Sequence, residues 1–262
     1  MNQKMEETLK VVLVQTTLHW ERPEKNRQMF SDKFDEIPED TDLIVLPEMF
    51  NTGFTMTPEH IENKEGQITL EWMQRKAREM QVAIMGSLPF FENDAYTNRL
   101  FFVRPNGNYQ QYDKRHTFTL AGEDKVYRSG NDRIVVNFKG FLICPLICYD
   151  LRFPVWSRNM ADYDVLIYVA NWPKPRINAW DTLLRSRAIE NMAYCIGVNR
   201  IGMDDAGREY VGHSAVYDVL GEQLAFSRKE EILKVTLYKN NIRTNRRKFR
   251  FLEDRDNFNL IG

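Results

Sequence analysis

The amino-acid sequence predicts an α/β protein in which helices cover a core of mixed β-sheets. Short β-branched runs alternate with amphipathic stretches in the first third of the chain, and turn sequences between apolar runs indicate antiparallel hairpins in the middle. No Ser/Gly/Pro linker, internal repeat or low-complexity tract divides the 262 residues. A chain of this length can bury a sizeable core, so we expect a single domain over residues 1–262.

The first third of the chain favours a βαβαβ arrangement. Its apolar runs are short and rich in Val, Ile and Leu, whereas the stretches between them are longer and amphipathic. Strands are therefore expected at residues 11–14, 43–46 and 82–88, with helices at 23–37 and 70–80.

Antiparallel pairing is expected in the middle of the chain. Residues 98–103 and 109–112 flank Pro105-Asn106-Gly107-Asn108, which is typical of a hairpin turn. Residues 133–138 and 141–147 flank Lys139-Gly140 in the same way. Beyond them, helices are expected at 154–160 and 179–192, and strands at 165–170, 194–199, 214–219 and 232–237. These elements suggest one layered domain.

The composition favours a small-molecule partner. Because 36 Lys and Arg balance 37 Asp and Glu, no global field attracts nucleic acid or an anionic membrane. The apolar run at 11–14 is too short for a signal-peptide core or a membrane span. Three cysteines form an odd and sparse set, which favours a reducing compartment, and we expect the cytoplasm.

Three polar residues directly follow strand-like runs, and their types together suit nucleophilic catalysis. Glu48, Lys114 and Cys148 each stand where a sheet presents reactive groups to a crevice. Acyl transfer from an amide needs a thiolate, a proton-transfer group and a cation near the developing oxyanion. A nearby lysine lowers the pKa of a thiol, whereas a nearby carboxylate and burial raise it. These residues alone therefore do not decide the resting protonation states of Cys148 and Glu48.

Each of these residues also has a structural interpretation. A cysteine after an apolar run is commonly a buried small hydrophobe, and a single Glu or Lys is commonly a solvated charge. Cys144 and Cys148 could also suggest zinc, but His213 is distant in sequence and no second cysteine pair exists, so no metal is expected.

Three segments around these residues resemble the nitrilase superfamily. They are Leu46-Pro47-Glu48-Met49-Phe50, Tyr112-Asp113-Lys114-Arg115-His116 and Cys148-Tyr149-Asp150-Leu151-Arg152-Phe153-Pro154, in the family's order. The resemblance extends through Asn171-Trp172-Pro173 and Arg185-Ser186-Arg187-Ala188-Ile189-Glu190-Asn191 and covers nearly the whole chain.

The resemblance implies a four-layer αββα sandwich that pairs into a homodimer or a higher homo-oligomer, with no cofactor. It makes Glu48 the general base and later the acid, Cys148 the nucleophile that forms a thioester, and Lys114 the oxyanion stabiliser. The Tyr149 backbone amide would be a second oxyanion donor. Glu123 falls where the family often carries a second glutamate that orients the lysine, although a surface-loop position is the alternative.

Other residues near the motifs are candidates for the substrate site. Asp150 and Arg152 could pair with each other or with neighbouring backbone and so hold the nucleophile's turn. Arg152 could instead meet a substrate carboxylate, but structural support is the favoured interpretation. Trp172 and Phe50 are candidate pocket residues, with core packing as the equal alternative.

The run from Cys148 to Asn159 is most similar to the omega-amidase branch, whose members hydrolyse the terminal amide of dicarboxylate monoamides such as 2-oxoglutaramate and 2-oxosuccinamate. Nitriles, N-carbamoyl amino acids and other aliphatic amides remain alternatives, because a few pocket contacts decide among them. A non-catalytic binding or scaffolding module is the alternative from another class.

The segment from about residue 239 is expected to serve subunit contacts. Its basic residues could instead touch RNA, but Glu253, Asp254 and Asp256 follow closely and favour a solvated or subunit-contact role. These basic residues are Arg243, Arg246, Arg247, Lys248 and Arg250.

Overall fold

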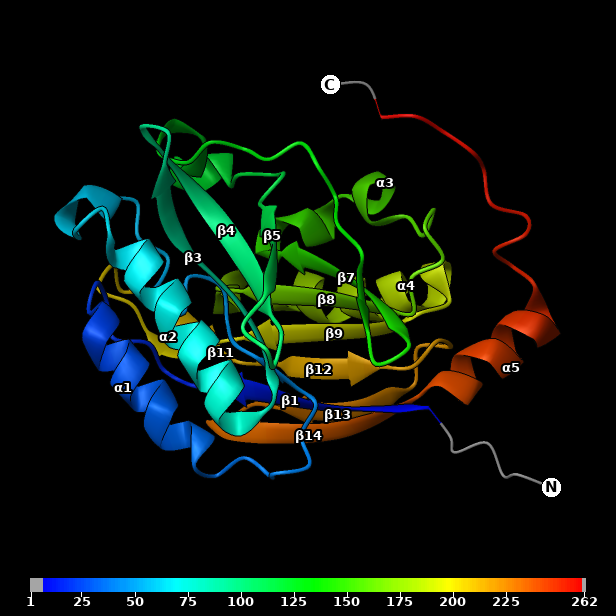
Figure 1. The fold of residues 1–262 in the computed structure, drawn as a ribbon. Helices are drawn as coiled ribbons and strands as arrows, with labels where there is room; N and C mark the ends of the chain where they lie inside the picture. Colours follow the sequence, from blue (N-terminus) through cyan, green and yellow to red (C-terminus); the bar gives the residue numbers. More distant parts are fainter. Residues whose placement is uncertain (1–6, 261–262) are drawn as a thin grey trace.

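The computed structural model describes residues 7–260, in which two six-stranded sheets lie face to face with helices outside them (Figure 1). The expected domain span of 1–262 therefore includes two ends, 1–6 and 261–262, that lie outside the described residues. A short two-stranded ribbon, β10 (Ile201–Met203) with β11 (Glu209–Val211), accompanies the two sheets.

The first sheet has the strand order β14-β1-β2-β3-β4-β5. Strands β1, β2 and β3 are parallel, whereas β4, β5 and β14 pair antiparallel with their neighbours. The strands are β1 (Thr8–Gln15), β2 (Leu43–Val45), β3 (Ala83–Glu92), β4 (Ala95–Val103), β5 (Tyr109–Asp113) and β14 (Glu231–Tyr238). This mixture of pairings is the predicted one.

The second sheet has the order β13-β12-β9-β8-β7-β6. Its central strands β7, β8 and β9 are parallel, and the flanking strands are antiparallel. The strands are β6 (Val136–Phe138), β7 (Phe141–Ile147), β8 (Val165–Ala170), β9 (Tyr194–Asn199), β12 (Ser214–Tyr217) and β13 (Gln223–Ser227).

Alternation of side chains along β1 shows how the layers form. Val11 and Leu13 belong to the apolar cluster shared with the second sheet, whereas Val12 and Val14 pack with α1 (Pro23–Phe34) and α2 (Glu65–Met80). On the far side, α4 (Ile177–Asn191) approaches β9 at Gly197, where an added Cβ would lie 2.4 Å from Leu184. The layers are thus helix, sheet, sheet and helix, as the resemblance implied.

Several predicted boundaries differ from those of the structure. The second helix begins at Glu65 instead of residue 70, and the helix expected at 154–160 is only the single turn α3 (Pro154–Ser157). Strands β3 and β4 form a hairpin that was not predicted. Its turn residues Asn93 and Asp94 both have positive φ, at 50° and 55°, which is the geometry of a tight hairpin turn.

The C-terminal segment forms a helix, α5 (Lys239–Phe249), that was not predicted. Its basic residues contact their own chain: Arg243 pairs with Glu7 at 2.9 Å, and Arg246 donates to the Met192 carbonyl at 2.9 Å. Use of this segment in subunit contacts stays a prediction, as does the absence of a nucleic-acid partner. Among residues 7–260, no helix combines the length and apolar character that a membrane crossing requires.

Candidate active site

The three predicted site residues come together where the two sheets meet. Glu48 follows β2 and Lys114 follows β5 in the first sheet, whereas Cys148 follows β7 in the second sheet. Glu48 and Lys114 are fully buried, and Cys148 is 8% exposed. The site therefore depends on the packing of the sheets against each other.

The Lys114 ammonium lies between two carboxylates. Its Nζ is 2.8 Å from Glu48 Oε1 and 2.8 Å from Glu123 Oε2. Burial opposes the charge of Lys114, but Glu123 and Glu48 outweigh it and raise the lysine pKa. Glu123 is itself fully buried, so the surface-loop alternative for this residue is wrong.

Asn98 and Asn171 hold the carboxylates and were not predicted from the sequence as site residues. Asn98 Nδ2 donates to Glu48 Oε1 at 2.9 Å and to Glu123 Oε1 at 3.1 Å. The Asn171 backbone amide donates to Glu48 Oε2 at 2.9 Å. Each glutamate thus receives several hydrogen bonds that fix its orientation. The only sequence signal for Asn98 was its position at the start of an expected strand.

The Cys148 thiol shares this charged environment. Burial and then the negative charge of Glu48 raise its pKa well above the ordinary thiol value, while Lys114 acts in the opposite direction. The resting cysteine is therefore protonated at neutral pH, and the Glu48 carboxylate that raises its pKa is the candidate proton acceptor.

Cys148 begins the short 3₁₀ helix η4 (Cys148–Arg152) with a backbone φ of 42°, in the left-handed region. A non-glycine residue is strained there, so the surrounding structure must hold it. Asp150 does so: it accepts from the Ile147 amide at 3.0 Å, the Tyr112 hydroxyl at 2.7 Å and the His116 amide at 3.0 Å. Of the two arrangements expected for Asp150, the structure has the one with backbone groups and not a pair with Arg152.

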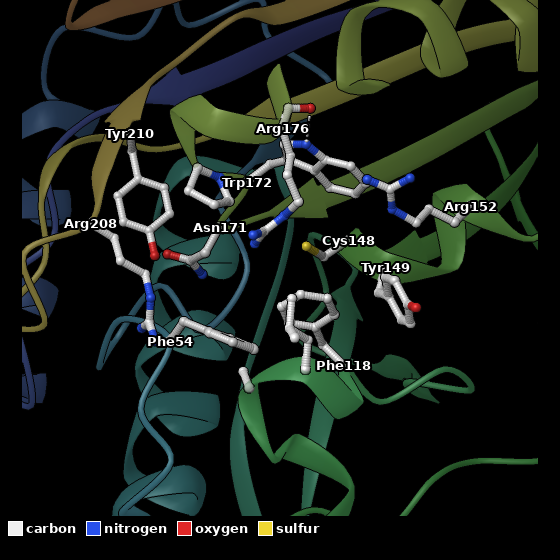
Figure 2. Close-up of a pocket in the computed structure, with 13 residues that line it drawn as sticks. Phe54, Phe118, Cys148, Tyr149, Arg152, Asn171, Trp172, Arg176, Arg208 and Tyr210 are labelled. Atoms are coloured by element: carbon white, nitrogen blue, oxygen red, sulfur yellow. Dashed lines mark hydrogen bonds between the residues drawn. The ribbon is translucent and has the colours of Figure 1, made fainter. Parts of the chain in front are cut away.

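Cys148 opens into a small pocket with about 100 Å³ of free space. Figure 2 shows its sulfur facing a cavity with aromatic and cationic walls. The lining residues include Phe54, Phe118, Tyr149, Arg152, Trp172 and Arg176. Arg152 and Trp172 were candidate pocket residues, and both lie in its wall.

Phe50 does not line this pocket and takes the other place considered for it, in the packed core. Its ring is fully buried on the helix side of the first sheet, 5.4 Å from Phe30 and 6.0 Å from Trp72 between ring centroids. Phe54, four residues later, forms the wall instead, and Lys114 Nζ lies 5.3 Å from its ring centroid.

The residues considered for zinc lie apart. Within the described part of the chain, no group of three His, Cys, Asp or Glu side chains is placed to hold a metal ion. Cys144 is buried in the core, which raises its pKa to about 12, and His213 pairs with Asp181 at 2.9 Å.

The fold and these motifs define a class of enzyme: the chain belongs to the carbon-nitrogen hydrolase family, whose sequence model matches residues 10–247. It is therefore a hydrolase of carbon-nitrogen bonds, and the non-catalytic alternative is not supported. This family assignment also confirms the resemblance identified from the sequence.

Named relatives cover 83% to 96% of the chain. It is 41% identical to "Omega-amidase YafV" of Escherichia coli strain K12, over 96% of this chain and 98% of the relative. It is 29% identical to a 2-oxoglutaramate amidase of Bacillus subtilis, over 83% and 86% of the two chains. A CN-hydrolase superfamily structure from Xanthomonas campestris, with an arsenic adduct in its active site, is 37% identical with a TM-score of 0.93, over 97% and 99%.

Proposed function

We propose that this protein is an omega-amidase that hydrolyses the terminal carboxamide of a small dicarboxylate monoamide through a Cys148 thioester. The observation that carries the proposal is the fully buried Lys114, whose Nζ lies 2.8 Å from both Glu48 and Glu123 next to a protonated thiol. Such an arrangement supplies a nucleophile, a proton acceptor and a fixed positive charge.

In the first half-reaction the Cys148 sulfur attacks the amide carbon while Glu48 takes the thiol proton. The oxyanion that forms is stabilised by the Lys114 ammonium and by the Tyr149 amide. This amide lies in the first turn of η4, where N–H groups lack helical acceptors. Glu48 then passes its proton to the leaving nitrogen, the C–N bond breaks, and ammonia and a thioester remain.

In the second half-reaction Glu48, again a carboxylate, removes a proton from water. The hydroxide oxygen attacks the thioester carbon, and the same donors stabilise the second oxyanion. The C–S bond breaks, the sulfur regains the proton from Glu48, and the carboxylic acid product leaves. Glu123 and Asn98 keep Lys114 and Glu48 in position throughout.

Two kinds of evidence support the proposed substrate class: the residues that line the pocket and the names of the relatives. The free space suits a small molecule, and three arginines, Arg152, Arg176 and Arg208, line the pocket, which favours an anionic substrate. Relatives that match most of the chain are named omega-amidase and 2-oxoglutaramate amidase. We therefore assign 2-oxoglutaramate or 2-oxosuccinamate as the substrate type.

Turnover of matched compounds tests this assignment. Ammonia release or substrate loss would be measured for succinamate, an aliphatic nitrile and an N-carbamoyl amino acid at equal concentrations. We expect succinamate to have the highest kcat/KM. A clear preference for the nitrile or the carbamoyl compound would exclude the omega-amidase assignment while leaving the cysteine chemistry in place.

A further inference from the structure

Three arginines, Arg152, Arg176 and Arg208, line the pocket, and their surroundings differ. Arg208 lies 3.6 Å from the Asp204 carboxylate and is therefore partly neutralised. Arg152 stacks over the Trp172 ring at 5.0 Å, and Figure 2 shows its guanidinium directed toward that ring. Only Arg176 extends its guanidinium into the space beside the Cys148 sulfur in this view.

The Arg176 guanidinium has no anionic partner in residues 7–260. Its charged group makes no ion pair and no hydrogen bond there, and its one described contact is with the face of the Phe118 ring, 4.9 Å away. The side chain is partly buried, and burial lowers its pKa. A partly buried cation without a counterion gains most from an anion that enters the pocket.

The backbone around Arg176 is well held. Its carbonyl accepts a hydrogen bond from the Trp172 indole nitrogen at 2.8 Å, and its amide donates to the Pro173 carbonyl at 3.0 Å. These backbone hydrogen bonds fix the position from which the Arg176 side chain extends along the pocket wall. A planar guanidinium can make two parallel hydrogen bonds to one carboxylate, which an ammonium cannot.

We propose that Arg176 is the specificity-determining residue that binds the far carboxylate of the substrate, and so selects amides of dicarboxylic acids over neutral amides. This assignment rests on the proposed omega-amidase function. It places the amide carbon at Cys148 and the carboxylate a few carbon atoms away at Arg176, so that both ends of one short substrate are held. No sequence pattern indicated Arg176 as a site residue.

Succinamate and succinamide form a matched substrate pair, because they differ only in a carboxylate and a neutral carboxamide at the far end. The wild-type protein, Arg176→Gln and Arg176→Lys would be compared on both. We expect Arg176→Gln to lower kcat/KM for succinamate by about 10- to 100-fold, mainly through KM, with little effect on succinamide. Arg176→Lys should recover part of the loss, because it keeps the charge without the planar fork.

Two further variants separate this role from others. Lys174→Gln removes an exposed positive charge, paired with Glu209, from the same turn outside the pocket, and should leave the substrate preference unchanged. If Arg152→Gln, and not Arg176→Gln, removed the preference for succinamate, the assignment to Arg176 would be wrong. Equal losses on both substrates in Arg176→Gln would show a structural role and would also contradict it.

Binding of succinate gives a readout that does not depend on turnover. Calorimetry would compare Cys148→Ala with Cys148→Ala/Arg176→Gln after thermal melting has shown that both are folded. A Kd about 10- to 100-fold weaker in the double variant supports the carboxylate site, and an unchanged Kd overturns it. If succinate binding depends on Arg176 but the wild-type protein hydrolyses neither amide, the omega-amidase function fails and the carboxylate site remains.

Discussion

Lys114 Nζ lies 2.8 Å from Glu48 Oε1, and both side chains are fully buried although they come from segments 66 residues apart. A buried charge is tolerated only when it is paired and hydrogen-bonded. Here the lysine has two carboxylate partners, and Asn98 bridges these carboxylates. The same contacts that make the cluster stable also place the proton acceptor and the cation beside the thiol.

Removal of the lysine charge should affect both stability and activity. Lys114→Met leaves two buried carboxylates without their cation, so we expect the free energy of unfolding in urea to fall by about 3–5 kcal/mol. We also expect kcat to fall on the order of a hundredfold to a thousandfold, because the oxyanion loses a donor. Adding Glu123→Gln should restore part of the stability but not the activity. Wild-type turnover in Lys114→Met would contradict the assigned role.

The pH dependence of Cys148 alkylation should reveal the neighbouring carboxylate. Because the thiol pKa is raised, the thiolate fraction, and with it the iodoacetamide rate, should continue to rise above the ordinary thiol range. Glu48→Gln removes a negative charge that raises this pKa, so the profile should move to lower pH although turnover is lost. Mass spectrometry after alkylation would measure the rates, with Cys148→Ala as the blank. A shift to higher pH in Glu48→Gln would contradict the electrostatic account.

Asp150 should act on the nucleophile through the backbone. Its carboxylate is fully buried and accepts from Ile147, Tyr112 and His116 around the strained turn. We expect Asp150→Asn to lower the free energy of unfolding by about 1–3 kcal/mol and to lower kcat with little change in KM. Asp124→Asn, on an exposed carboxylate, is the control and should stay within about 0.5 kcal/mol of the wild type. Similar results for the two variants would argue against a positioning role.

Two phenylalanines four residues apart should respond differently to truncation. Phe50→Ala removes a ring from the packed helix-side core, and the free energy of unfolding should fall by about 3–5 kcal/mol. Phe54→Ala removes a ring from the pocket wall, so its main effect should be a changed KM for succinamate. Denaturant unfolding and steady-state kinetics on both variants would test this division. A larger KM effect in Phe50→Ala than in Phe54→Ala would contradict this division.

The buried parallel strands were the best predicted part of the fold. Residues 165–170 and 194–199 coincide with β8 and β9, because a strand covered on both faces is a continuous apolar run with clear ends. The ribbon of β10 and β11 and the edge strand β13 were missed, because short, partly exposed strands carry little apolar pattern. Helix α5 was missed because its few apolar residues leave only Ile242 buried.

The site was only partly predictable for a related reason. Glu48, Lys114 and Cys148 stand directly after strand-like runs within recognisable motifs, so their convergence could be expected from the sequence. The contact of Asn171 with Glu48 joins residues 123 positions apart, and no local pattern indicates it. Phe50 and Phe54 are the same residue type four positions apart, so the sequence does not distinguish them. Only the packing of the helices on the first sheet shows that Phe50 lies in the core and Phe54 in the pocket wall.

The most direct test of the account is ammonia release from 2-oxoglutaramate by the wild-type protein and by Cys148→Ala, in reducing buffer that contains a chelator. The account predicts rapid release by the wild-type protein and loss of nearly all turnover in the variant, because no other group replaces the nucleophile. Equal release by the two proteins would contradict the cysteine mechanism.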